Sequence, residues 1–172
     1  MVQSTVPIFG FSAYSGTGKT TLLKQLIPLL IQKGLRIAVI KHSHHDFDLD
    51  VPGKDSYELR KSGASRTIIC SSTRMATIDE FTHPEDEPPL QDIISNVDRS
   101  KFDLILVEGY KPLSFPKIEL HRHSLGKPYL FPQDDSIEAI ASDEPVDDCD
   151  LEQLDINNVG AIAEFIYTRF FG

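Results

Sequence analysis

A glycine-rich segment near the N-terminus combines residue types and spacing that suit phosphate binding. The sequence AYSGTGKT at residues 13–20 closely follows an apolar run at 6–11 and leads into a leucine-rich stretch with helical spacing. In this order of strand, loop and helix, backbone N–H groups, the helix dipole and the lysine ammonium group converge on one anion. The segment therefore predicts a P-loop that binds a nucleoside triphosphate, although Ala13 stands where the strict pattern has glycine. The expected nucleotide contacts are Ser15, Gly16, Thr17, Gly18, Lys19, Thr20 and Thr21.

A bound triphosphate is normally accompanied by Mg²⁺, which needs oxygen ligands near the phosphates. The hydroxyl of Thr20, directly after the lysine, is placed to supply one. Glu108 follows a predicted buried strand at 102–107, and Asp46 lies in a loop after the apolar run at 35–40. We expect that loop to respond to the γ-phosphate, as switch loops do. We therefore assign Glu108 and Asp46 magnesium-binding and catalytic, water-positioning roles, with a solvent-exposed carboxylate as the alternative.

Candidates for the remaining nucleotide contacts lie farther along the chain. Lys54 and Arg74 are candidate phosphate ligands, with solvated surface charge as the alternative. Asp143 follows an apolar run, and its carboxylate can accept hydrogen bonds from both N1–H and N2–H₂ of guanine, a pair of donors that adenine lacks. We therefore expect GTP rather than ATP as the ligand, although the Asn-Lys-x-Asp signature of many GTPases is absent.

The loop that contains Asp46 also holds three histidines. His42, His44 and His45 are ligand types that transition metals accept, and alternating residues of an extended segment could converge on a metal ion. Nothing in the sequence fixes that geometry, however. We therefore expect the histidines to be solvated or to face the phosphates, and a transition-metal site is the alternative.

The rest of the sequence predicts the elements that must position these residues. Buried or half-buried strands are expected at 6–13, 35–40, 102–107, 117–121 and 137–141, and helices at 20–33, 55–63, 90–97 and from 159 onward, the last capped by Asn158 or Asn157. Two short β-type runs at 66–71 and 74–79 predict an antiparallel hairpin. Strands that alternate with helices favour an α/β fold of the P-loop NTPase class, a mostly parallel sheet flanked by helices with the hairpin added. We predict a single nucleotide-binding domain over 1–172, with a hairpin insertion at about 66–80.

This arrangement predicts one site that gathers residues from several strands. In parallel sheets, ligands bind at the carboxyl ends of the strands. Ala13, His42, Glu108 and Asp143 follow four different predicted strands and would all lie at that edge.

Composition narrows the classes of partner. The 172 residues include 26 acidic and 17 basic side chains, a net charge of −9 that disfavours nucleic acid as a partner. The chain opens with no signal-peptide pattern and holds no apolar run near the ~20 residues of a membrane span, so we expect a cytoplasmic protein with no membrane partner. Cys70 and Cys149 are the two cysteines, which suggests neither a disulfide framework nor a thiolate zinc site, and Cys70 lies in an apolar run expected to be buried.

Six blocks spread over nearly the whole chain are more specific than the P-loop alone. They are SGTGKTTL at 15–22, IKHSHHD at 40–46, PGKDSYELRK at 52–61, LVEGYK at 106–111, PKIEL at 116–120 and ASD at 141–143. Together they resemble the molybdopterin-guanine dinucleotide biosynthesis protein B (MobB) family. Tyr110 stands where phenylalanine is expected, and the segments 83–89 and 124–136 match no part of the family pattern.

The resemblance implies a cytoplasmic, homodimeric protein that binds GTP and has weak GTPase activity. Such proteins assist the attachment of guanosine monophosphate to molybdopterin as adapters, so the implied partners are a molybdopterin guanylyltransferase and, as a further ligand, molybdopterin itself. Weak activity also agrees with the sequence, in which no arginine finger or equivalent glutamine stands beside the P-loop.

Two other functions use the same motif. A small-molecule kinase carries this P-loop, but its phosphate lid needs arginines, and the second half of this chain offers only Arg99, Arg122 and Arg169. A nickel-type metallochaperone GTPase would instead account for the histidine-rich loop. Both remain alternatives to the adapter.

Overall fold

The computed structural model describes residue 4 and residues 6–43, 47–83, 87–98 and 100–172. Within it the chain divides into two compact units. The first unit consists of Met1–His42 and Leu90–Gly172, and the second, Ser43–Pro89, is inserted between these two segments of sequence. The hairpin expected at about 66–80 belongs to the second unit, which is larger than the predicted insertion.

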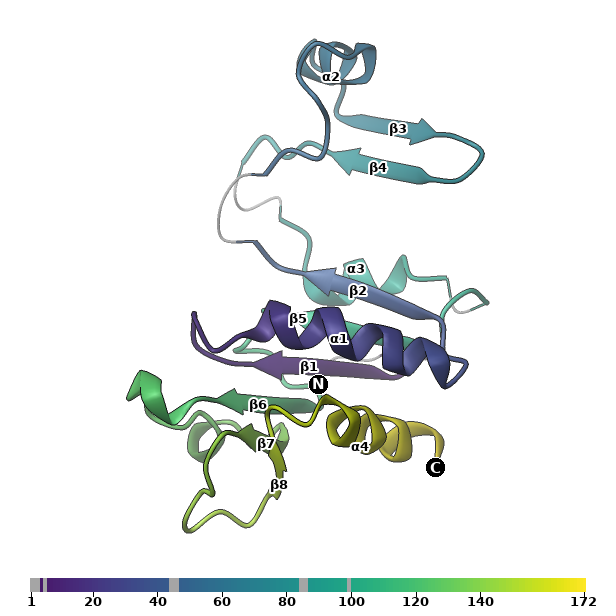
Figure 1. Ribbon diagram of the computed structural model, residues 1–172. Helices are drawn as coiled ribbons and strands as arrows, with labels where there is room; N and C mark the ends of the chain where they lie inside the picture. Colours follow the sequence, from purple (N-terminus) through teal and green to yellow (C-terminus); the bar gives the residue numbers. More distant parts are fainter. Residues whose placement is uncertain (1–3, 5, 44–46, 84–86, 99) are drawn as a thin grey trace. The chain divides into compact units, whose positions relative to one another are not determined.

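A six-stranded parallel sheet forms the centre of the first unit (Figure 1). Its strands, in spatial order, are β2 (Ile37–Lys41), β5 (Leu104–Glu108), β1 (Ile8–Ser12), β6 (Lys117–His121), β7 (Ile137–Ser142) and β8 (Glu152–Asp155). Every residue of β1 is buried because the strand lies between β5 and β6. The predicted mostly parallel sheet is confirmed, and β8 is a strand that the sequence analysis did not predict.

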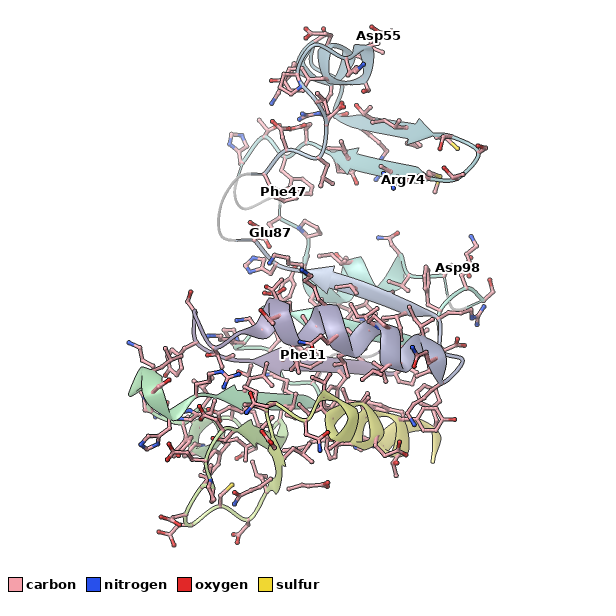
Figure 2. All side chains as sticks on the ribbon, viewed as in Figure 1. Phe11, Phe47, Asp55, Arg74, Glu87 and Asp98 are labelled. Carbon is pink, nitrogen blue, oxygen red and sulfur yellow. The ribbon has the colours of Figure 1, made fainter. Side chains whose placement is uncertain are left out.

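Helices cover both faces of this sheet. α1 (Lys19–Gln32) and α4 (Val159–Phe171) pack on one face, and α3 (Leu90–Ser95) packs on the other. Successive residues of a strand point to opposite faces, so Leu104 and Leu106 join the core under α1 and α4 while Ile105 and Val107 join the core under α3. Phe11 of β1 lies inside the first of these cores (Figure 2).

Strand β6 is buried along its whole length although every second residue is polar. Lys117, Glu119 and His121 alternate with apolar residues and occupy the face opposite α1 and α4. The carboxylate of Glu119 accepts hydrogen bonds from the backbone N–H groups of Leu130 and Phe131, at 2.9 and 2.8 Å. Burial raises the pKa of Glu119, and these two backbone donors only partly counteract it. The segment after β6, with its short 3₁₀ turns η2 (His123–Leu125) and η3 (Phe131–Gln133), is thus fastened to the sheet.

The second unit contains α2 (Asp55–Lys61) and an antiparallel hairpin of β3 (Arg66–Cys70) and β4 (Met75–Asp79), which confirms the predicted hairpin. The guanidinium of Arg60 is buried and bonded to the carboxylates of Asp48 and Glu80, which ties α2 to the segments on either side. The expectation that Cys70 is a buried thiol is wrong: the residue is exposed. A two-stranded hairpin leaves most of its side chains uncovered, so an apolar run does not imply burial here.

The helices in the described part of the chain are short or amphipathic. None of the helices there has the length and apolar character needed to span a bilayer.

Candidate functional site

The P-loop connects β1 to α1 at the carboxyl edge of the sheet. Gly16 and Gly18 have φ angles of 86° and 97°, a left-handed conformation that strains other residues, and Gly18 stands at the N-cap of α1. The buried Thr17 closes the turn, because its Oγ1 donates to the carbonyl of Tyr14 at 2.9 Å. No side chain caps α1, and its first turn holds no acidic residue. The positive end of the helix is therefore free of an internal carboxylate that would compete with a bound anion.

Most of the predicted contact residues of the loop are accessible to solvent. Ser15, Gly16, Gly18, Thr20 and Thr21 are exposed and Lys19 is half-buried. Thr17 differs, since it is buried and its hydroxyl is used inside the turn.

Glu108 lies next to the loop, as expected. It pairs in register with Phe11 of β1 on one side and with Lys41 of β2 on the other. Its Oε2 lies 3.3 Å from Nζ of Lys41, and the Glu108 side chain is 15% exposed. A carboxylate of this kind can hold Mg²⁺ directly or through water, and the lysine balances its charge.

The backbone turns sharply just after Glu108. Gly109 has a φ of 104°, and Tyr110 follows with a φ of 52°, a conformation uncommon for a residue with a side chain. A Cβ atom on Gly109 would lie 2.7 Å from Cβ of His42, so only glycine fits. The rings of His42 and Tyr110 then pack with centroids 4.6 Å apart. His42, which is half-buried, therefore packs against this turn.

Lys111 is a second cation near the P-loop that the sequence analysis did not assign. Its Nζ lies 5.1 Å from the ring centroid of Tyr14, which is a residue of the P-loop. Burial lowers the pKa of Lys111, the charge of Lys19 lowers it further, and Glu119 opposes both effects. The available signal was its place in the block LVEGYK, immediately after the turn that follows Glu108.

Asp143, the predicted guanine ligand, follows β7 and is held in place by two groups. Its Oδ1 accepts a hydrogen bond from the backbone N–H of His123 at 2.9 Å, and its Oδ2 lies 3.5 Å from Nη1 of Arg122. The bond from His123, together with the charge of Arg122, lowers the pKa of Asp143 below its ordinary value. Asp143 is thus an ionised acceptor at neutral pH.

A cavity of about 300 Å³ opens beside the P-loop, and Arg122, the ion-pair partner of Asp143, is one of the residues that line it. It is lined by the loop residues 16–18, by Thr21 and Gln25 of α1, and by Arg122 and Asn157. Its volume is at the lower end of the range of small-molecule sites. Arg122 and Asn157 were missed by the sequence analysis, in which Asn157 was considered only as a helix cap and Arg122 only as material for a lid.

The remaining predicted residues belong to the second unit or lie outside the described residues. Lys54, at the N-cap of α2, and Arg74, directly before β4 (Figure 2), belong to the second unit, so their contact with phosphate stays a prediction. Asp46, His44 and His45 lie outside the described residues. Elsewhere, within the ranges that the structure describes, no group of three or more His, Cys, Asp or Glu residues could hold a metal ion.

Comparison with known proteins relates this site to one family. A family model described as Molybdopterin guanine dinucleotide synthesis protein B matches residues 8–143. The chain is 50% identical over 165 residues to the molybdopterin-guanine dinucleotide biosynthesis adapter protein of Escherichia coli (strain K12), covering 95% of this chain and 93% of that protein. The protein of the same name from Haemophilus influenzae is 41% identical over 165 residues, with coverage of 96% and 90%.

Solved structures show the same fold. A crystal structure of molybdopterin-guanine biosynthesis protein B (mobB) matches with a TM-score of 0.71 at 28% identity, covering 94% of this chain and 99% of that one. Bacillus subtilis MobB matches with a TM-score of 0.74 at 18% identity, covering 96% and 99%, and this second match concerns the fold alone. The predicted α/β fold of the P-loop NTPase class is confirmed.

Proposed function

The chain belongs to the molybdopterin guanine dinucleotide synthesis protein B family, and from this membership we propose that it is a cytoplasmic adapter in molybdopterin guanine dinucleotide biosynthesis that binds GTP with Mg²⁺ and hydrolyses it slowly. The observation that carries the nucleotide part of the proposal is the P-loop. Two left-handed glycines shape the loop, and α1 begins directly after it with Lys19 as its first residue and no acidic residue in its first turn. A triphosphate is the ligand whose charge such a site best accommodates.

Mg²⁺ completes the proposed site. Thr20 stands in the first turn of α1, and Glu108 ends the strand beside β1. Both supply the hard oxygen ligands that Mg²⁺ prefers. Lys41 neutralises Glu108 through its 3.3 Å ion pair, and we expect the ion and its water ligands to replace that partner. Asp46 stays a proposed further ligand.

Slow hydrolysis follows from how the arginines are used. In the described part of the first unit, Arg36 pairs with Asp103, Arg169 pairs with Glu138, and Arg122 bonds to the carbonyl of Thr17 on the cavity side of the loop. None of these three is offered to the γ-phosphate. An arginine placed there accelerates hydrolysis by roughly 10³–10⁵, so we expect efficient turnover only if a partner supplies such a group.

The adapter role requires a surface for other proteins, and the second unit is our candidate for it. Phe47, Leu49, Ile68 and Met75 are large apolar side chains that are 69%, 72%, 60% and 70% exposed (Phe47 is labelled in Figure 2). A lone two-stranded hairpin is marginally stable in water, and β3 and β4 pair only with each other among the described strands. We propose that this unit mediates the homodimer, while the molybdopterin guanylyltransferase is the proposed partner enzyme and molybdopterin a further ligand.

Calorimetric titration with Mg·GTP tests the proposal directly. The wild-type chain should bind one GTP, Lys19→Ala should lose binding, and Lys24→Ala, an exposed lysine on the same helix, should bind as the wild type does. Equal GTP affinity in the wild type and Lys19→Ala would exclude the P-loop as the binding site. Transfer of phosphate from the nucleotide to a pterin or nucleoside would instead support a kinase.

A further inference from the structure

Arg122 links three parts of the first unit around the cavity beside the P-loop. Its Nε donates to the carbonyl of Thr17 at 3.3 Å, and its Nη2 donates to Oδ1 of Asn157 at 3.1 Å. Its Nη1 lies 3.5 Å from Oδ2 of Asp143. One planar guanidinium group thus contacts the P-loop, the residue after β7 and the connection between β8 and α4. A lysine could not serve three partners in these directions.

The bond to Arg122 determines how the amide of Asn157 is oriented. A guanidinium group has donors and no acceptor, so the oxygen of the amide must face it. The Nδ2 group, on the other side of the same amide, is then available as a donor. The backbone of Asn157 is held as well, because its N–H donates to Oδ1 of Asp155 at 2.8 Å. Asn157 lines the cavity, so this oriented donor lies where a ligand would be bound.

Asp143 provides hydrogen-bond acceptors, whereas Asn157 provides a donor. Two carboxylate oxygens can together accept about four hydrogen bonds. One oxygen receives the N–H of His123 and the other faces Arg122, which leaves acceptor capacity on both. The site therefore offers a fixed amide donor and a fixed acceptor pair, connected through one arginine.

These two groups match the Watson–Crick edge of guanine, which carries the O6 acceptor beside the N1–H and N2–H₂ donors. We propose that Asn157 is a specificity-determining residue that donates to O6, that Asp143 accepts from N1–H and N2–H₂, and that Arg122 is the positioning residue for both. Adenine presents a donor at C6 and an acceptor at N1, so each contact becomes a mismatch. The inference rests on the proposed binding of GTP at the P-loop. It goes beyond that proposal by assigning the cavity to the base.

The affinities for three nucleotides distinguish the contributions of the proposed hydrogen bonds to the base. GTP carries all three groups, ITP lacks the 2-amino group but keeps O6 and N1–H, and ATP reverses both remaining positions. Asn157→Asp replaces the amide donor by an acceptor. This variant should bind GTP and ITP more weakly by the same factor, about 5- to 150-fold, since one hydrogen bond becomes a mismatch. Its affinity for ATP should not fall. Asn158→Asp is the matched control because an aspartate keeps the α4 cap that Asn158 provides to the N–H of Ala161.

Arg122→Lys tests the positioning role. It keeps a positive charge, so a purely electrostatic or structural role predicts equal weakening of GTP, ITP and ATP or no change. The proposal predicts instead that the ratio of GTP to ATP affinity falls while the melting temperature stays near that of the wild type.

The outcomes distinguish this inference from the proposed function. Failure of the wild-type chain to bind GTP at all would overturn the proposed function and this inference with it. Wild-type preference for GTP that persists unchanged in both Asn157→Asp and Arg122→Lys would overturn this inference alone. Loss of GTP and ITP affinity in Asn157→Asp, with normal binding by Asn158→Asp, would support it.

Discussion

Replacing Asp134 with alanine should lower the free energy of unfolding by about 3–5 kcal/mol, because it would strand a buried ammonium group. Lys117 of β6 is 1% exposed in its side chain, and its Nζ donates to Oδ2 of Asp134 at 2.6 Å. Among the described residues, the ammonium group also donates to the carbonyl of Lys111, at 2.8 Å. Loss of the carboxylate therefore leaves a full charge in the protein interior with one neutral partner.

Two further variants divide this effect into its parts. Asp134→Asn keeps an oxygen acceptor but removes the charge, so we expect a smaller loss, on the order of 1–3 kcal/mol. The double variant Lys117→Met/Asp134→Ala removes both charges and fills the space with an apolar side chain beside Phe115, whose ring lies 5.1 Å from the lysine nitrogen. It should recover most of the stability, since apolar replacements of buried ion pairs are often neutral or stabilising.

Urea unfolding and calorimetry measure these differences. For a chain of this size, 3–5 kcal/mol corresponds to a fall in Tm of about 6–20 °C. Burial alone would raise the pKa of Asp134, but the hydrogen bonds from Lys117 and Ser136 outweigh it and lower the pKa. The stabilisation is thus complete above the ordinary carboxyl pKa of about 4 and is lost as the pH falls through the lower, folded value. A loss below 1 kcal/mol in Asp134→Ala, or a double variant no more stable than Asp134→Ala, would refute the reasoning.

Three other changes act on the site and on assembly. Asp143→Asn should shift the base preference from GTP toward XTP in competition assays, because an amide donor suits the C2 carbonyl of xanthine, and an unchanged preference would count against this base contact. Glu108→Gln should retain GTP binding without Mg²⁺ but lose the gain that Mg²⁺ gives, by tenfold or more, as followed by calorimetry with and without the ion. Ile68→Asp and Met75→Asp should each convert the proposed homodimer to a monomer, because each places a charge on the apolar surface of the second unit, and sedimentation should show half the molecular mass. Leu113 is an exposed residue of the first unit, so Leu113→Asp should leave the mass unchanged. If both hairpin variants sediment as the wild type does, the second unit is not the dimer surface.

The P-loop between β1 and α1 could be predicted from sequence because its signals are local. The apolar run before the P-loop is buried on both faces, and the loop and helix follow it without interruption. Glu108 could be placed for the same reason, since the four strand residues that precede it are all buried. Strand β8 could not, because its sequence EQLD is polar and mostly exposed at the edge of the sheet.

The proposed base contacts depend on residues far apart in the sequence. Arg122 is 105 positions from Thr17 and 35 from Asn157, and no local pattern marks such partners. The burial of Lys117 was equally hidden, because its partner Asp134 lies in an irregular segment. Cys70 was misjudged because an apolar run in a hairpin resembles a core strand until its neighbours are known.

The most direct test of the account is the structure of crystals soaked with Mg·GTP. We predict a triphosphate held by the backbone of residues 16–18 and by Lys19, with the guanine ring in the cavity beside Asn157. A P-loop without phosphate density, in crystals that hold the nucleotide at another position, would contradict it.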